Sequence, residues 1–171
     1  TRIDNYYWLN QREDQEVIDY LNAENAYTDS MMNHTDKFQT KLFDEMVARI
    51  KKTDESVPFK SNEYFYYSRT EGDAEYPLYC RKKGSLDAEE EIMLNVPEMA
   101  KGHNYFAVGS YSVSEDNKIL AFSEDTVSRR KYTIKFKSLV DDKVYTDEIA
   151  NNTGGITWAS DNKTVFYTVE H

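Results

Sequence analysis

The sequence predicts a mainly β chain that is preceded by a helical segment. Apolar residues recur with helical spacing before residue 57 and with a period of two after residue 58. Aromatic residues make up 14% of the chain, including 14 Tyr and 8 Phe, and such side chains favour strands. We therefore expect a helical N-terminal extension over residues 1–57 and a β region over residues 58–171.

Two helices are expected in the N-terminal extension. Asp14 can cap the first helix, and Asp36 can cap the second helix with Gln39 in the capping-box position. The apolar stripes of these two helices are Val17, Tyr20, Leu21, Tyr27 and Met31, and Phe38, Leu42, Met46 and Ile50. Pro58 then closes the helical region.

Short strand candidates fill the β region and show an internal repeat. The segment SEDNKILAFSED at 114–125 resembles ASDNKTVFYTVE at 159–170, and KSNEYFYYS at 60–68 is a fainter copy. The Asp-Asn-Lys turn of the first segment recurs 45 residues later, between two apolar strands in each case. Four short strands in each unit of roughly this length are typical of β-propeller blades.

The strand spacing divides the β region into partial propeller blades. We expect a three-strand blade over 58–96, a four-strand blade over 104–150 and the start of a further blade over 154–171. A closed propeller needs more blades, and the chain begins with Thr rather than Met, so we expect a segment of a longer protein. The competing architecture is an open meander or sandwich with two flanking helices.

Composition excludes several classes of function. The formal net charge of −10 argues against nucleic-acid binding, and no apolar run approaches the roughly 18 residues of a membrane helix. Cys80 is the only cysteine, so the chain itself has no disulfide or cysteine metal cage, and strand alternation predicts that Cys80 is buried. No signal peptide is visible in this segment; we expect a cytoplasmic location, with the periplasm as the alternative.

Catalytic motifs are not found in the sequence. It contains no Gly-x-Ser-x-Gly elbow, and His34, His103 and His171 are each expected at the surface. No metal-ligand, calcium-loop or phosphate-loop pattern occurs, so we expect no cofactor and no metal.

Arg129 and Arg130 are the candidate functional residues, because they stand at the mouth of a predicted strand within SEDTVSRRKYTIKF. One interpretation is that they pair with Glu124 or Asp125 across the turn, which contributes little if the pair is exposed. The other is that their guanidinium groups are presented to a carboxylate-bearing ligand or to a second domain.

A family resemblance extends over essentially the whole chain. DNYYWLNQREDQEVIDYLNAENAYT at 4–28 resembles the N-terminal signature of the prolyl oligopeptidase family of serine peptidases. SEDTVSRRKYTIKFKSL resembles second-blade strands of that family, and the Ser-Arg-Arg form, EYPLYCRK and ITWASDNKTVFYTVEH are most similar to its oligopeptidase B (protease II) branch.

The resemblance implies a seven-bladed propeller over an α/β-hydrolase domain that lies outside this chain. A Ser-Asp-His triad in that domain would cleave short peptides, after Lys or Arg in the oligopeptidase B branch, and the propeller would exclude folded proteins. The N-terminal helices would pack partly against the hydrolase domain. Arg130, and with it Arg129, would lie on a rim loop that faces the interdomain cavity and would meet substrate or a carboxylate of the other domain.

Two functions of different classes follow from the sequence. The first is the non-catalytic, gating portion of a serine oligopeptidase, which would be inactive alone because the triad is absent. The alternative is a stand-alone propeller that binds partners without peptidase activity. In either case we expect the isolated segment to self-associate through an unpaired strand edge at its C-terminal end.

Overall fold

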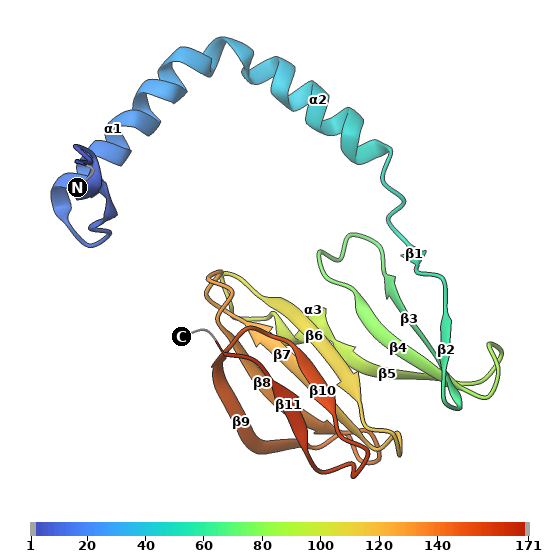
Figure 1. The fold of residues 1–171 in the computed structure, drawn as a ribbon. Coiled ribbons are helices and arrows are strands. Elements are labelled where there is room, and N and C mark those ends of the chain that lie inside the picture. Colours follow the sequence, from blue (N-terminus) through green and yellow to red (C-terminus); the bar gives the residue numbers. More distant parts are fainter. Residues whose placement is uncertain (1–2, 170–171) are drawn as a thin grey trace. The chain divides into compact units, whose positions relative to one another are not determined.

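A computed structural model describes residues 3–169 of the chain, which divides into two compact units, Thr1–Lys51 and Lys52–His171. The first unit is helical and the second is built from strands (Figure 1). The short strand β1 (Asp54–Glu55) belongs to the second unit because it pairs with β3 (Tyr64–Thr70). The β unit therefore begins before residue 58, where the sequence analysis placed its start.

The helical unit contains two α-helices and two short 3-10 turns. Their bounds are η1 (Tyr7–Asn10), α1 (Gln15–Met32), η2 (Asn33–Thr35) and α2 (Asp36–Ala48). The predicted cap of α1 is confirmed, since Asp14 Oδ1 accepts a hydrogen bond of 2.9 Å from the backbone N–H of Glu16. The predicted cap of α2 is wrong by one residue: Thr35 is the N-cap, because η2 runs directly into α2, and Gln39 Nε2 donates to Thr35 Oγ1 at 2.7 Å.

The apolar stripes of α1 and α2 are largely exposed. Val17 is buried, whereas the other stripe residues lie at the surface, as illustrated by Phe38 with 65% of its area exposed. Helical spacing thus predicted the helices correctly, but these stripes find no burial within the helical unit. Neither α1 nor any other helix in residues 3–169 is long and apolar enough to span a bilayer.

The β unit consists of two sheets and a hairpin, all with antiparallel neighbours. The first sheet comprises β1, β2 (Phe59–Ser61), β3, β4 (Leu78–Lys83) and β5 (Glu90–Asn95), in the order β1-β3-β4-β5 with β2 also paired to β3. The second sheet comprises β6 (Ala107–Val113), β7 (Ile119–Asp125), β8 (Tyr132–Ser138) and β9 (Val144–Asn152), in chain order. The hairpin is β10 (Ile156–Trp158) with β11 (Val165–Tyr167).

The first sheet has more strands than the three expected from the sequence. The additional strands β1 and β2 lie one after the other along the same edge of β3. They are separated by a segment that contains Pro58, which has no backbone N–H to donate to a ladder. A short helix, α3 (Val96–Met99), then follows β5 and leads to the second sheet.

The main apolar core joins the first sheet to the second. Its buried members are Tyr64, Tyr66, Met93, Leu94, Val96, Phe106, Leu120 and Phe122. Tyr79 of β4 and Tyr111 of β6 pack beside it with ring centroids 4.8 Å apart. Each sheet therefore buries one face against its neighbour, which is how successive propeller blades stack.

The Asp-Asn-Lys repeat forms the tight turns of successive hairpins. Asn62, Asn117 and Asn162 have positive φ angles of 52°, 61° and 57°, a left-handed conformation that Asn tolerates better than most residues. In the two full copies the Asp carboxylate accepts the backbone N–H of the Lys two residues later, at 3.2 Å for Lys118 and 2.9 Å for Lys163. The repeat is thus explained by turn geometry.

These turns also connect neighbouring sheets. Arg81 of β4, with only 2% of its area exposed, donates from Nη1 to the carbonyl oxygen of Asn117 at 2.9 Å. The Asn162 Oδ1 in turn accepts the backbone N–H of Asp116 at 2.9 Å. Arg81 is held by Glu91, through a bond of 2.7 Å, and lies 4.1 Å from the ring centroid of Tyr64.

On the opposite face of the first sheet, Cys80 is fully buried with Tyr67 and Leu78, which confirms the prediction for this cysteine. Burial raises the pKa of the Cys80 thiol to about 12, so it is protonated at neutral pH. Beside it, Glu90 accepts hydrogen bonds from the Tyr67 hydroxyl and from Arg69 Nη2, the latter at 2.7 Å. The Arg69 hydrogen bonds, supported by Tyr67, outweigh partial burial and lower the pKa of Glu90 to about 2.

We predict that Glu90→Gln destabilises the β unit in a pH-dependent way. A carboxyl group with a depressed folded-state pKa stabilises the fold above its unfolded pKa of about 4.5, and this contribution is lost as the pH falls toward about 2. At pH 7 the variant should lose about 2 kcal/mol in free energy of unfolding, measured by urea denaturation. The difference from the unmodified chain should shrink between pH 4.5 and pH 2, whereas the exposed neighbour variant Glu89→Gln should show no such trend. A pH-independent loss would contradict this assignment.

Candidate functional site

The loop of residues 126–131, between β7 and β8, is organised around one buried carboxylate. Asp125 ends β7 with 1% of its area exposed. Its Oδ1 accepts the backbone N–H groups of Val127 and Ser128 at 2.8 and 3.0 Å. Its Oδ2 accepts those of Arg129 and Arg130 at 3.1 and 2.8 Å. Four consecutive backbone donors of the loop therefore converge on a single side chain.

The charge of Asp125 is stabilised by the same hydrogen bonds. Burial by itself raises the pKa of this carboxyl group, but the backbone donors outweigh burial and hold the pKa below its usual value. Asp125 is therefore ionised at neutral pH. The loop pays for this arrangement with two non-glycine residues in the left-handed region, Ser128 at φ 63° and Arg130 at φ 56°.

The side chains of Arg129 and Arg130 lie at the surface of this loop. The Arg129 guanidinium donates to the Ser128 carbonyl at 3.3 Å, and neither arginine forms an ion pair with a carboxylate within residues 3–169. The pairing considered for them is absent there because both candidate partners are engaged: Glu124 binds Lys135 at 2.5 Å, and Asp125 binds the loop backbone. No carboxylate of the described residues therefore neutralises the charge of either guanidinium group.

The end of the loop is fixed by close packing around Tyr132. A Cβ atom at Gly109 would lie 2.5 Å from the Tyr132 ring, and one at Gly154 would lie 2.9 Å from it, so only glycine fits on either side. Asn152 Nδ2 donates to the Tyr132 carbonyl at 2.8 Å, while its Oδ1 accepts the Gly154 N–H at 2.8 Å. Both ends of residues 126–131, which we call the arginine loop, are thus held by the rigid sheet.

Strand register places the arginine loop at one edge of the stacked sheets. Ala107, which begins β6, pairs with Asp125, and Tyr132 pairs with Asn152, which ends β9. The Asp-Asn-Lys turns lie at the other ends of these strands, so the loop and the turns occupy opposite edges (Figure 1). Sequence analysis located the arginines on a rim loop but did not identify Asp125 as the anchor, because four converging backbone donors leave no sequence pattern.

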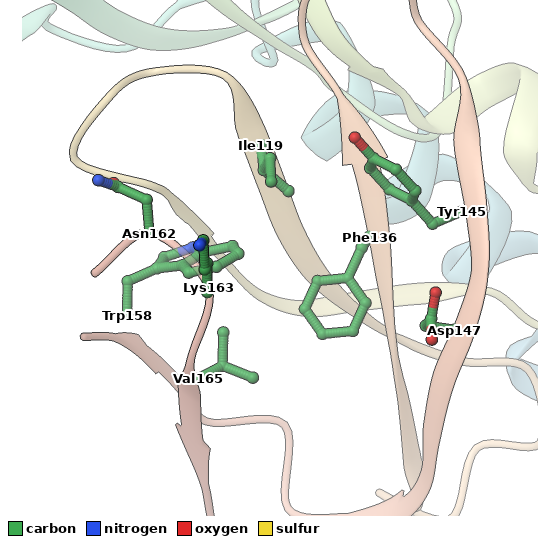
Figure 2. Close-up of a pocket in the computed structure, with 8 residues that line it drawn as sticks. All are labelled: Ile119, Phe136, Tyr145, Asp147, Trp158, Asn162, Lys163 and Val165. Atoms are coloured by element: carbon green, nitrogen blue, oxygen red, sulfur yellow. The ribbon is translucent and has the colours of Figure 1, made fainter. Parts of the chain in front are cut away.

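A second feature, which sequence analysis missed, is a pocket of about 380 Å³ between the second sheet and the β10–β11 hairpin. It is lined by Ile119, Phe136, Tyr145, Asp147, Trp158, Asn162, Lys163 and Val165 (Figure 2). Phe136 and Trp158 meet edge to face with centroids 6.2 Å apart, and Trp158 Nε1 donates to the Ser112 carbonyl at 3.0 Å. The available signal was the presence of aromatic residues in three successive strands: Phe136 in β8, Tyr145 in β9 and Trp158 in β10. The lining is mainly apolar, and Arg129 and Arg130 are not part of it.

Catalytic groups are not brought together in the part of the chain that the structure describes. His34 and His103 are exposed as expected, the latter beside the Phe106 ring, and His171 lies outside the described residues. Between residues 3 and 169 no three His, Cys, Asp or Glu side chains are grouped so that they could hold a metal ion.

Curated relatives match nearly the whole chain. A dipeptidyl aminopeptidase BI of Pseudoxanthomonas mexicana is 40% identical across 97% of this chain. A protease 2 of Moraxella lacunata is 32% identical across 98% of it. The chain spans about 25% of the length of each of these relatives.

Solved structures share the architecture. Oligopeptidase B from Leishmania major superposes with a TM-score of 0.90 at 28% identity, covering 99% of this chain and 25% of that one. Oligopeptidase B from Trypanosoma brucei, in a closed form with covalently bound antipain, gives a TM-score of 0.88 at 25% identity, covering 99% and 24%. The propeller prediction and the resemblance to the oligopeptidase B branch are therefore confirmed, and the alternative of an open meander or sandwich is wrong.

The family match accounts for every element described above. Residues 1–171 match the family described as "Prolyl oligopeptidase, N-terminal beta-propeller domain". The match includes the helical lead-in, both sheets and the β10–β11 hairpin. The chain thus belongs to the prolyl oligopeptidase family and corresponds to part of its N-terminal propeller domain.

Proposed function

We propose that this chain is the non-catalytic propeller portion of a serine peptidase that cleaves short peptides. The observation that carries the proposal is the match of 97–98% of the chain to much longer proteins that are named as peptidases. Peptide cleavage would be performed by a Ser-Asp-His triad in an α/β-hydrolase domain outside these residues. There the serine would attack the scissile carbonyl while the histidine moves the proton and the aspartate orients the histidine.

The propeller portion would control which substrates reach that triad. Stacked sheets with a continuous apolar core make the propeller rigid. A rigid propeller next to the active site would let short flexible peptides reach the triad more readily than folded proteins. Cleavage after Lys or Arg is the specificity that we propose, supported by the similarity to protease 2 and to the oligopeptidase B structures. A second candidate, removal of dipeptides from a free N-terminus, is favoured by the 40% identity to a dipeptidyl aminopeptidase.

Within this scheme Arg129 and Arg130 would bind a carboxylate of the peptide substrate or of the hydrolase domain. Three properties support the role: the side chains are exposed, they have no ion-pair partner in residues 3–169, and their loop is anchored at both ends. Guanidinium groups bind carboxylates through paired hydrogen bonds, so they suit this function. The exposed stripes of α1 and α2 would be covered by the hydrolase domain, which supplies the apolar partner that the helical unit lacks.

We expect the 171-residue chain alone to be inactive and the full-length protein to be active. Both are incubated with an N-terminally blocked arginyl chromogenic peptide and with an unblocked dipeptidyl substrate. Hydrolysis of the blocked peptide by the full-length protein supports the endopeptidase, and hydrolysis of the unblocked substrate alone supports the dipeptidyl aminopeptidase. If neither is cleaved, the stand-alone binding module is favoured. Turnover by the isolated chain that a serine-directed inhibitor abolishes would refute the assignment.

We predict that replacing Arg129 and Arg130 together by Ala in the full-length protein raises KM for peptide substrates several-fold, up to about tenfold, as expected for loss of a charge-assisted contact. Thermal stability should stay unchanged because both side chains are exposed. Lys118→Ala is the matched control, since it removes an exposed cation at the opposite edge of the sheet. Unaltered kinetics in the double variant would leave the arginines as an ordinary solvated loop.

We further propose that the isolated chain self-associates through the free edge of β11, a strand that in residues 3–169 pairs only with β10. Light scattering should give a mass above that of the monomer at high concentration. Phe166→Lys places a charge on this exposed strand and should reduce the mass. A strict monomer, or association that Phe166→Lys leaves intact, would contradict the role of this edge.

A further inference from the structure

We infer that Asp125 is the positioning residue for Arg129 and Arg130, the group that holds their guanidinium-bearing segment in a binding-competent conformation. The inference rests on the proposed function of the two arginines. Asp125 is buried, so we expect it to act only through its hydrogen bonds to the backbone of the loop.

The chemistry of the anchor requires a carboxylate. Both oxygens accept two backbone N–H groups each, so all four hydrogen bonds need a side chain with two acceptor oxygens and no donor. An asparagine at this position has one acceptor oxygen and could satisfy only one of the two pairs. Its NH₂ group would face the N–H groups of the other pair, which would lose their acceptor. Either orientation of the amide therefore breaks two of the four bonds that hold the segment carrying Arg129 and Arg130.

The hydrogen bond to Asp125 also fixes the direction in which the Arg130 side chain projects from the backbone. At φ 56° the residue is left-handed, a conformation that is unfavourable for residues other than glycine. The hydrogen bond of 2.8 Å from its N–H to Asp125 Oδ2 offsets this cost. Without it Arg130 would return to the ordinary φ range, and its side chain would point in another direction. Because Asn152 holds Tyr132 in place, the rearrangement would be confined to residues 126–131.

Preorganisation is valuable at this position because, apart from the hydrogen bond from Arg129 to the Ser128 carbonyl, no partner within residues 3–169 orients the two arginine side chains. Neither side chain has a carboxylate partner within residues 3–169, and Glu124, the adjacent acid, is paired with Lys135. Long flexible cations that bind a ligand lose conformational entropy, and a fixed backbone reduces that loss. Release of the loop should therefore weaken binding through the arginines, while the rate of peptide cleavage in the hydrolase domain stays unchanged.

The test combines kinetics with hydrogen exchange in the full-length protein. Asp125→Asn is compared with the Arg129→Ala/Arg130→Ala double variant and with the triple combination. Asp116→Asn is the matched control, because its carboxylate also binds a backbone N–H, that of Lys118, but in a turn at the opposite edge. We expect Asp125→Asn to raise KM several-fold with little change in kcat, and to have no further effect on KM in the double-variant background. Asp116→Asn should leave KM unchanged.

Hydrogen exchange separates the loop from the catalytic readout. In Asp125→Asn the amides of residues 127–130 should exchange at least about tenfold faster, while those of β7 and β8 keep their protection. If Asp125→Asn does not fold, Asp125→Glu replaces it, since it keeps the charge and both acceptors but displaces them by one methylene.

Two results would overturn the inference, and a third would overturn its premise. Unchanged exchange at residues 127–130 would show that Asp125 does not hold the loop. Faster exchange without a KM change, alongside a KM change in the double variant, would show that loop order does not serve the arginines. An unchanged KM in the Arg129→Ala/Arg130→Ala double variant would refute the proposed function of the arginines. It would also refute any positioning role for Asp125, whatever the exchange data show.

Discussion

The stacking of one small sheet on the next is the interaction on which the structure depends. A sheet of four or five short strands has two faces and cannot bury either by itself. Here the face that carries Tyr64, Tyr66 and Met93 closes against the face that carries Leu120 and Phe122, and a continuous core forms between them. Arg81 adds a polar connection at the margin of this interface, since its buried guanidinium reaches the carbonyl of Asn117 in the next sheet. This core and the Arg81 contact hold the first and second sheets together.

The loops at the two ends of the strands in the stacked sheets differ in length and in charge pairing. At one end of the strands lie the Asp-Asn-Lys turns, in which a left-handed Asn and a hydrogen-bonded Asp make compact hairpins. The turn that contains Asn162 also accepts a hydrogen bond from the backbone N–H of Asp116 in the preceding turn. At the other end lies the longer arginine loop, whose cations have no ion-pair partner in residues 3–169. Rigid scaffolds commonly carry their binding groups on such loops. The turns and the loop thus differ in how their charged side chains are paired: Lys118 pairs with Asp116, whereas Arg129 and Arg130 have no carboxylate partner within residues 3–169.

Polar groups inside the sheets serve as anchors because each is fully hydrogen-bonded. Asp125 accepts four backbone donors, and Glu90 is held by Arg69 and Tyr67 while Cys80 beside it stays neutral. A buried carboxylate without such partners would be strongly destabilising, whereas a satisfied one fixes the segment that it binds. In the loop of residues 126–131 this anchoring fixes the backbone from which Arg129 and Arg130 extend.

Local pattern determined much of this protein from the sequence alone. The N-cap and spacing of α1, the period of two in the strands and the burial of Cys80 depend on neighbours a few residues apart. The repeat that indicated blades is visible because the same local turn pattern recurs 45 residues later. Tertiary structure decided what depends on distant partners: the additional strands β1 and β2, the exposure of the helical stripes and the pocket around Trp158. It also decided the conformation of the arginine loop. The four hydrogen bonds of Asp125 go to residues only two to five positions away, but the left-handed conformations of Ser128 and Arg130 in that loop follow from no sequence pattern. The physical reason is that periodicity records which residues can be buried, whereas only the folded chain shows which surface buries them.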